Sequence, residues 1–99
     1  MQENRIRTVI LDQNLSVRAA APLFEVLFKC AGLPLEIDAA AVKHLDAPCA
    51  QLLLAAKRSS LASNTAFEII TPSKNFLESL DALGLAAFLG PKSELGHVS

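Results

Sequence analysis

The chain has 99 residues, which is enough for one domain with a single hydrophobic core. It carries 9 basic and 10 acidic side chains, and all 5 aromatic residues are phenylalanine, so the composition does not favour a nucleic-acid partner. No apolar run approaches the roughly 18–20 residues of a membrane span, and we expect no direct membrane insertion. With no hydrophobic leader at its start and only 2 cysteines, the sequence favours a cytoplasmic domain.

The first third of the chain changes from a strand pattern to a helix pattern. Residues 8–11 are β-branched or apolar and predict a strand, which the polar residues 12–14 end. Because Pro22 would interrupt a helix that began at Ser16, we expect the regular helix to begin at residue 19 or 20 and to close at Gly32. Its apolar stripe is predicted to contain Ala20, Leu23, Phe24, Leu27, Phe28 and Ala31.

The rest of the chain repeats this alternation twice. Residues 33–37 and 65–70 predict two further strands. The helix between them opens with Pro48, and a polar link over residues 59–64 follows it. A last helix is expected to begin near Ser73, its candidate cap, and to end at Gly84, with a short strand or a turn of helix over residues 85–89. Residues 91–99 have nothing to bury, so we expect a flexible tail after a domain of residues 1–90.

This order of elements favours one fold class. The succession β-α-β-α-β-α with short connections predicts an α/β domain with right-handed crossovers. We therefore expect a single small domain whose helices pack against a mixed, mostly parallel sheet of about four strands.

The loop after the second strand and the helix start that follows it form the candidate site. Asp38 ends the strand, the loop carries Lys43 and His44, and Asp46 stands just before the helix that Pro48 opens. In that position Asp46 is well placed to cap the free amides of the first turn. Asp38 and Asp46 also suggest a carboxylate pair for metal or acid–base work, but a strand end and a helix cap are the favoured interpretations. The pattern predicts an exposed polar surface at one end of the sheet.

The cysteine in this helix start has two interpretations. A thiol in a first helical turn can have a lowered pKa, which would make Cys49 reactive. Because Cys49 shares a face with Leu52 and Leu53, the favoured interpretation is a small buried packing residue. A zinc site built from Cys30, Cys49 and His44 lacks the paired spacing of such sites.

No sequence motif indicates an enzyme. The chain has no dinucleotide fingerprint, no phosphate-binding loop and no Gly-x-Ser-x-Gly turn. Nothing in it assembles a nucleophile, a base and oxyanion donors. We therefore expect a binding module that has no catalytic residues and uses neither a cofactor nor a metal.

Three consecutive segments resemble those of a known family. They are LEID at residues 35–38, VKHLD at residues 42–46 and APCAQLL at residues 47–53. Together they resemble the core of STAS domains, the fold of anti-sigma-factor antagonists. Residues 11–23 and 65–85 are similar to other parts of that fold, so the resemblance covers roughly residues 6–89. It implies a small regulatory domain that docks on a partner protein, often a serine kinase of the GHKL ATPase type.

The sequence departs from the family at its phosphorylation site. The family's phosphorylatable serine lies in the turn that opens the second helix. When the sequences are matched at Asp46, the family's positions fall on Ala47, Pro48 and Cys49, and no Ser or Thr lies between Asp38 and Lys57. The resemblance therefore does not carry over the switch in which a phosphate adds negative charge to the docking surface.

Two functions remain open at this point. The favoured one is a non-phosphorylatable STAS adaptor in bacterial signal transduction, with a GHKL-type anti-sigma kinase, a chemotaxis histidine kinase or a response regulator as partner, and with a homodimer also open. The alternative is a STAS subunit of a phospholipid-transport ABC complex, for which an exposed apolar patch would be the distinguishing feature. The expected partner-binding surface consists of Lys43, His44, Asp46, Ala47, Pro48 and Gln51.

Overall fold

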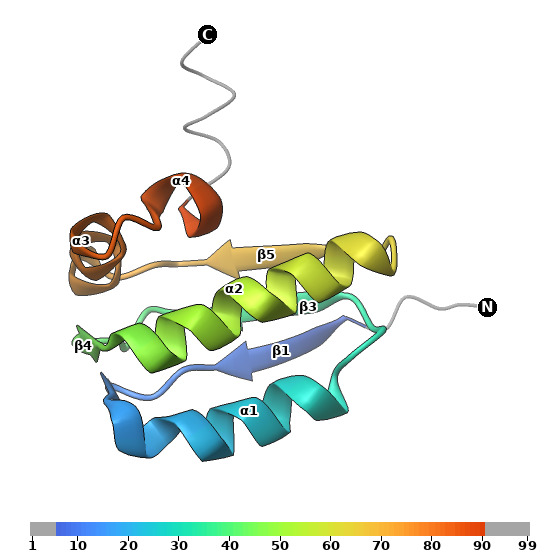
Figure 1. Cartoon of the computed structure of the whole chain (residues 1–99), viewed down its shortest axis with the longest axis horizontal. Coiled ribbons are helices and arrows are strands. Elements are labelled where there is room, and N and C mark those ends of the chain that lie inside the picture. The colour runs from blue at the N-terminus through green and yellow to red at the C-terminus, as the bar shows by residue number, and fades with distance from the viewer. Residues whose placement is uncertain (1–5, 91–99) are drawn as a thin grey trace, which may run out of the picture.

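Strands and helices alternate along residues 6–90, the part of the chain that the computed structural model describes. The main strands are β1 (Arg7–Ile10), β3 (Leu35–Asp38) and β5 (Phe67–Ile70). The helices are α1 (Ala20–Lys29), α2 (Ala47–Ala62), α3 (Lys74–Ala82) and α4 (Ala86–Leu89) (Figure 1). Two short strands, β2 (Asn14–Leu15) and β4 (His44–Leu45), and a 3-10 turn, η1 (Val17–Ala19), complete the order. The tail expected at residues 91–99 lies outside the described residues, as do residues 1–5.

The main sheet is parallel and has the strand order β1-β3-β5. Val9, Ile37 and Ile69 lie opposite one another in register and form one row across it. Strands β2 and β4 form a separate parallel pair, in which Asn14 lies opposite His44. The prediction of an α/β domain with a parallel sheet is confirmed. The predicted mixed sheet of about four strands is wrong, because the described sheet has three strands, all parallel, and residues 86–89 form helix α4.

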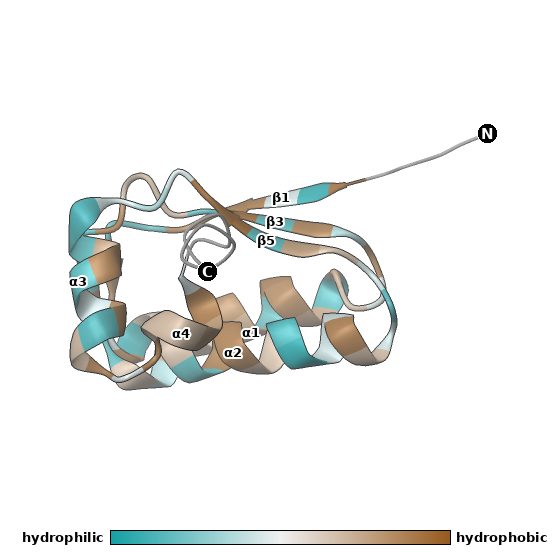
Figure 2. Ribbon diagram, turned by 90° about the horizontal axis from the view of Figure 1, so that it is seen from above, coloured by the Kyte–Doolittle hydropathy of each residue, from teal (hydrophilic) through white to brown (hydrophobic). Residues whose placement is uncertain are grey.

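The strand order places the long helices on the same face of the sheet. The chain steps from β1 to β3 to β5 in one direction, and parallel crossovers are right-handed, so α1 and α2 must lie on one side. Figure 2 shows this arrangement, with no described helix on the opposite face. Parallel sheets are usually covered on both faces. Here the open face bears Ile10, 71% exposed, and the cross-strand neighbours Glu36 and Glu68.

The hydrophobic core is the single layer between the sheet and these helices. Ile37 of the central strand and Leu53 of α2 are fully buried in it. Phe76 and Leu80 of α3 are also fully buried and close the core at the end where the strands finish (Figure 1). Cys49 is buried in the same cluster, as its position beside Leu53 on α2 predicted.

Local capping chemistry sets the helix ends. Ser73 is the N-cap of α3, and its Oγ accepts a hydrogen bond from Phe76 N at 3.0 Å, as predicted. At the other end, Gly84 has φ +76°, and the backbone N–H of Leu85 donates to Leu80 O at 2.8 Å. This pattern is the Schellman motif, in which a left-handed residue ends the helix and the next residue packs back on it.

Helix α2 continues further than the sequence suggested. The polar link predicted over residues 59–64 is wrong, because the helix runs on to Ala62 and Asn64 adopts φ +61° just after it. The N–H of Thr65 then donates to Ser60 O at 2.9 Å, which completes a second Schellman motif. Asparagine tolerates the left-handed conformation better than most residues, so it takes the place usually held by glycine.

The apolar stripe of α1 is only partly buried. The helix begins at Ala20, as predicted, and Leu23 and Leu27 lie in the core. Phe24 and Phe28, which belong to the same predicted stripe, are 53% and 69% exposed. Helix α1 lies at the edge of the helical layer (Figure 1), so no described element covers the outer side of its stripe. The predicted stripe is therefore buried only on its inner side.

We expect Ser73→Ala to lower the free energy of unfolding by about 2 kcal/mol. The change removes the cap of α3 and also the hydrogen bond that Ser73 Oγ donates to Val42 O at 2.6 Å. Urea unfolding measures the loss, and Ser63→Ala is the control, because Ser63 is exposed and lies just after α2. A loss for Ser73→Ala no larger than for Ser63→Ala would contradict this account.

Candidate functional site

The candidate site lies at the edge of the sheet where all three main strands end. Parallel strands place their carboxyl ends at one edge, so the segments that follow β1, β3 and β5 all begin there. The loop from Ala39 to Asp46 leaves β3 there, and α2 begins beside it and runs back over the sheet (Figure 1). The candidate residues therefore lie on the connection between the central strand and the central helix.

Backbone hydrogen bonds to the β2 segment hold one side of this loop. Gln13 O accepts from the N–H groups of Lys43 and His44, at 2.8 and 3.1 Å. Leu15 O accepts from Asp46 N at 3.0 Å. Leu45, the inward residue of β4, is 4% exposed and anchors the loop in the core. These bonds fix the backbone that presents the side chains of Lys43 and His44 to solvent.

Contacts with the start of α3 hold the other side of the loop. Ser73 N donates to Ala39 O at 3.1 Å, and Ser73 Oγ donates to Val42 O. One serine therefore caps a helix and fastens the loop to it. Val42 itself is 1% exposed, so its carbonyl needs this internal partner.

Asp38, where the loop leaves β3, organises its first turn. Its Oδ1 accepts from Ala40 N at 3.0 Å and from Thr71 Oγ1 at 2.8 Å. Both bonds favour the charged carboxylate, the backbone bond most, and they lower the pKa of Asp38. Thr71 has φ +44°, an unfavourable conformation for a β-branched residue. Asp38 ends β3, which agrees with the favoured interpretation. Its carboxylate also joins the turn after β3, at Ala40, to the turn after β5, at Thr71.

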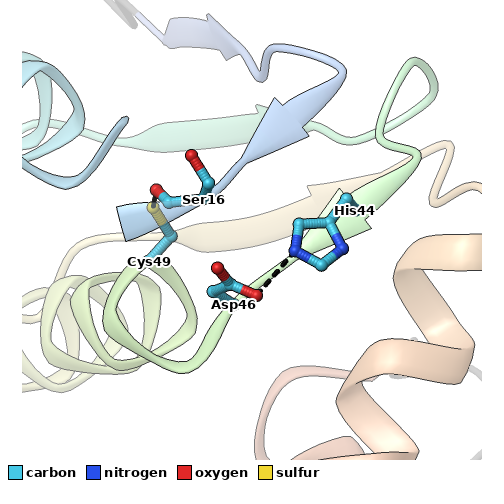
Figure 3. A network of polar contacts seen from close by, with 4 residues as sticks. All are labelled: Ser16, His44, Asp46 and Cys49. Atoms are coloured by element: carbon cyan, nitrogen blue, oxygen red, sulfur yellow. Dashed lines mark hydrogen bonds and ion pairs between the residues drawn. The ribbon is translucent and has the colours of Figure 1, made fainter. Parts of the chain in front are cut away.

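The side chain of Asp46 does not cap the helix, contrary to our prediction. Asp46 is the N-cap residue by position, with φ −92° and ψ 163°, but it makes no side-chain capping bond. Its Oδ1 lies instead 2.6 Å from His44 Nε2 (Figure 3). Asp46 and His44 are separated by one residue on an extended segment, where side chains i and i+2 lie on the same face. This proximity gives the carboxylate a partner outside the helix.

The six predicted surface residues occupy one continuous stretch of the chain. Lys43, His44, Ala47, Pro48 and Gln51 are exposed, and Asp46 is partly buried between His44 and the helix. Pro48 stands in the first turn of α2, as predicted. Because all six lie within residues 43–51, at the loop and the start of α2, we refer to them together as the α2 docking surface.

The thiol of Cys49 lies behind this surface. Cys49 is fully buried, and its Sγ donates to Ser16 O at 3.5 Å (Figure 3). Burial raises the pKa of the Cys49 thiol, and the negative charge of Asp46 raises it further. Both effects oppose thiolate formation, so the geometry agrees with a packing residue and argues against a nucleophile.

One exposed apolar residue near the start of α2, Val17, was not part of the predicted site. Val17 follows Ser16 and is 65% exposed. It lies in η1, which packs against α2, so an exposed apolar side chain stands on an element next to that helix. The pairing of β2 with β4 determines this arrangement, and two strands of two residues are too short to show a hydrophobic period.

Comparisons with protein-family models and with curated proteins find no match to this chain. Within residues 6–90, no helix is both long and apolar enough to cross a membrane. In the same part of the chain, no group of three or more His, Cys, Asp or Glu side chains is arranged to hold a metal ion.

We expect the free energy of unfolding to fall when Asp38 is protonated in acid. An Asp whose folded pKa is lowered adds stability above its unfolded value of about 3.9, and this contribution is lost as the pH falls through the folded pKa. Asp38→Asn cannot titrate, so its deficit in unfolding free energy against the wild type is expected to be constant above the unfolded pKa of about 3.9 and to shrink as the pH falls below it. Urea unfolding at several pH values measures the deficit, and a difference that stays constant below that pKa as well would refute the linkage.

We expect Cys49 to be protected from thiol reagents in the folded protein. In a Cys30→Ala background, Cys49 is the one remaining thiol of the chain. Its reaction with a chromogenic disulfide reagent should be at least about 100-fold slower in buffer than in urea, because the buried thiol reacts only after opening. Fast labelling of the native protein would restore the interpretation of Cys49 as a reactive residue.

Proposed function

We propose that this chain is a non-catalytic regulatory adaptor of the STAS type that binds a partner protein through the α2 docking surface. The observation that carries the proposal is the arrangement of that surface. Lys43, His44 and Asp46 lie on a loop whose backbone is held by hydrogen bonds to the β2 segment on one side and to Ser73 on the other. Ala47, Pro48 and Gln51 are exposed at the start of α2, which follows this loop directly. Such a surface needs little ordering when a partner binds, which favours specific docking.

The chemistry of the surface favours a transient partner over a permanent one. Lys43, His44 and Gln51 are polar and exposed, and Val17 and Pro48 supply a small apolar component. Polar surfaces of this kind are typical of regulatory contacts, whereas permanent complexes bury larger apolar patches. The resemblance to STAS domains supports a GHKL-type kinase, a histidine kinase or a response regulator as the class of partner.

The serine switch of the family is not part of this proposal. Ala47 and Pro48 stand at the corresponding positions and have no hydroxyl group to phosphorylate. Both residues are exposed in the first turn of α2, so this turn can still contact a partner. Docking in this chain is therefore proposed to be independent of phosphorylation there.

We expect Ala47→Glu to weaken partner binding at least tenfold, because it adds an unpaired charge to the centre of the interface. Helix N-termini favour acidic residues, so the fold should tolerate the change. Ala82→Glu is the matched control, since Ala82 is also exposed on a helix but belongs to α3. The measurement is purification of the full tagged chain and its two variants from extracts of its own cells, with mass spectrometry of the proteins retained.

Two results would overturn the proposal. Equal recovery of the same partner by the Ala47→Glu and Ala82→Glu variants would remove the α2 docking surface from consideration. Recovery of a permease together with its ATPase would assign the chain to a transport complex instead of a signalling system. Recovery of a kinase or a response regulator with the wild type and the control, and its loss with Ala47→Glu, supports the adaptor.

A further inference from the structure

A groove opens between α1 and α2 at the end of the molecule opposite the α2 docking surface. The two helices lie side by side (Figure 1), and residues mainly from their C-terminal halves line the groove together with Leu35 at the start of β3. Its volume is about 160 Å³. The apolar walls and floor include Phe24, Leu27, Phe28, Leu35, Leu52 and Ala56. Among the described residues that line it, none is charged.

Two aromatic rings form the outer wall of this groove. Phe24 and Phe28 are stacked, with ring centroids 5.9 Å apart and an angle of 25° between the rings, yet both are more than half exposed. Together they leave roughly 250 Å² of apolar surface in contact with water. A stable dimer buries about 800 Å² on each partner, so these rings are too small a patch for a second copy of the chain. The patch is better matched by a small molecule.

A buried hydroxyl group is the second sign of a ligand. Ser60 lines the groove and is only 7% exposed. Its backbone oxygen accepts from Thr65, but within residues 6–90 its Oγ has no hydrogen-bond partner. Buried hydroxyl groups are usually paired, and an unpaired one costs free energy. A ligand with one polar group would satisfy it.

We propose that this groove binds a small uncharged molecule built on a single ring, with one hydroxyl or carbonyl group hydrogen-bonded to Ser60 Oγ. The size argument is direct, because an apolar protein cavity of about 150 Å³ is enough to hold benzene. The ring lies against Phe28 and Leu52, and the polar group points toward the wall that contains Ser60. A charged group is excluded from the buried part, since the lining offers it no partner.

The test uses 4-fluorobenzyl alcohol as the probe and 4-fluorotoluene as its counterpart without the hydroxyl group. Fluorine NMR of the probe and amide shifts of the full chain report binding and its location. We expect saturable shifts of amides in the C-terminal halves of α1 and α2. Ser60→Ala should weaken the alcohol about fivefold and the toluene less than about twofold, because only the alcohol loses a hydrogen bond.

A second variant tests the groove without touching the core. Ala55 lines the groove but is exposed, so Ala55→Phe should fill the opening and weaken both probes at least about tenfold. Ala82→Phe on α3 is the matched control and should leave both affinities unchanged. Absence of saturable shifts, or equal binding by the Ala55→Phe and Ala82→Phe variants, would overturn the site.

Two further outcomes would overturn parts of the proposal. Equal effects of Ser60→Ala on the two probes would reject the hydrogen bond to its hydroxyl group. Amide shifts in the groove that depend on protein concentration without any probe, and that Ala55→Phe abolishes, would identify a second copy of the chain as the occupant.

Discussion

The structure depends on the handedness of its crossovers. A chain that steps through a parallel sheet in one direction, always with right-handed connections, must place every crossover helix on the same face. The core is therefore one layer, and Ile37 at the middle of the central strand lies at its centre. The opposite face of the sheet receives no helix from residues 6–90 (Figure 2).

The same constraint also decides how much of each helix is buried. Helix α2 connects β3 to β5 and lies in the middle of the layer, with α1 on one side and α4 on the other (Figure 1). Its buried apolar residues are Cys49, Ala50, Leu53 and Leu54, whereas α1 at the edge buries only Leu23 and Leu27 of its stripe. Helix α2, which has a neighbouring helix on both sides, thus begins at the α2 docking surface. Helix α1, which has a neighbouring helix on one side only, forms the wall of the groove at the other end.

Sequence patterns predicted the features that depend on local chemistry. Ser73 as a cap, Gly84 as a helix end and Pro48 in a first turn each follow from the hydrogen bonds and φ angles of neighbouring residues. The burial of the α1 stripe does not follow from such local chemistry, because a neighbouring element decides it. A helical period shows that Phe24 belongs to an apolar face, but the width of the buried part depends on whether another element lies beside it.

The candidate site was predicted only in part. The sequence predicted an exposed polar loop before a helix, and Lys43 and His44 are exposed there, because such a loop lies at the surface in almost any α/β fold. It did not predict that the side chain of Asp46 pairs with His44. The sequence allows the same carboxylate either to cap the helix or to pair with His44, and it does not decide between the two. Nor did it show the exposed position of Val17, which depends on the pairing of β2 with β4.

The missing hydroxyl groups change what the same turn can do. A phosphate adds roughly 1.5 to 2 negative charges, and in the family that this chain resembles it alters the docking surface directly. Ala47 and Pro48 exclude this route, and hydrogen bonds with Gln13, Leu15 and Ser73 hold the backbone of the preceding loop. The proposed docking therefore needs no phosphate in this turn. Under the proposed function, control over docking therefore lies with the amount of this chain or with changes on the partner.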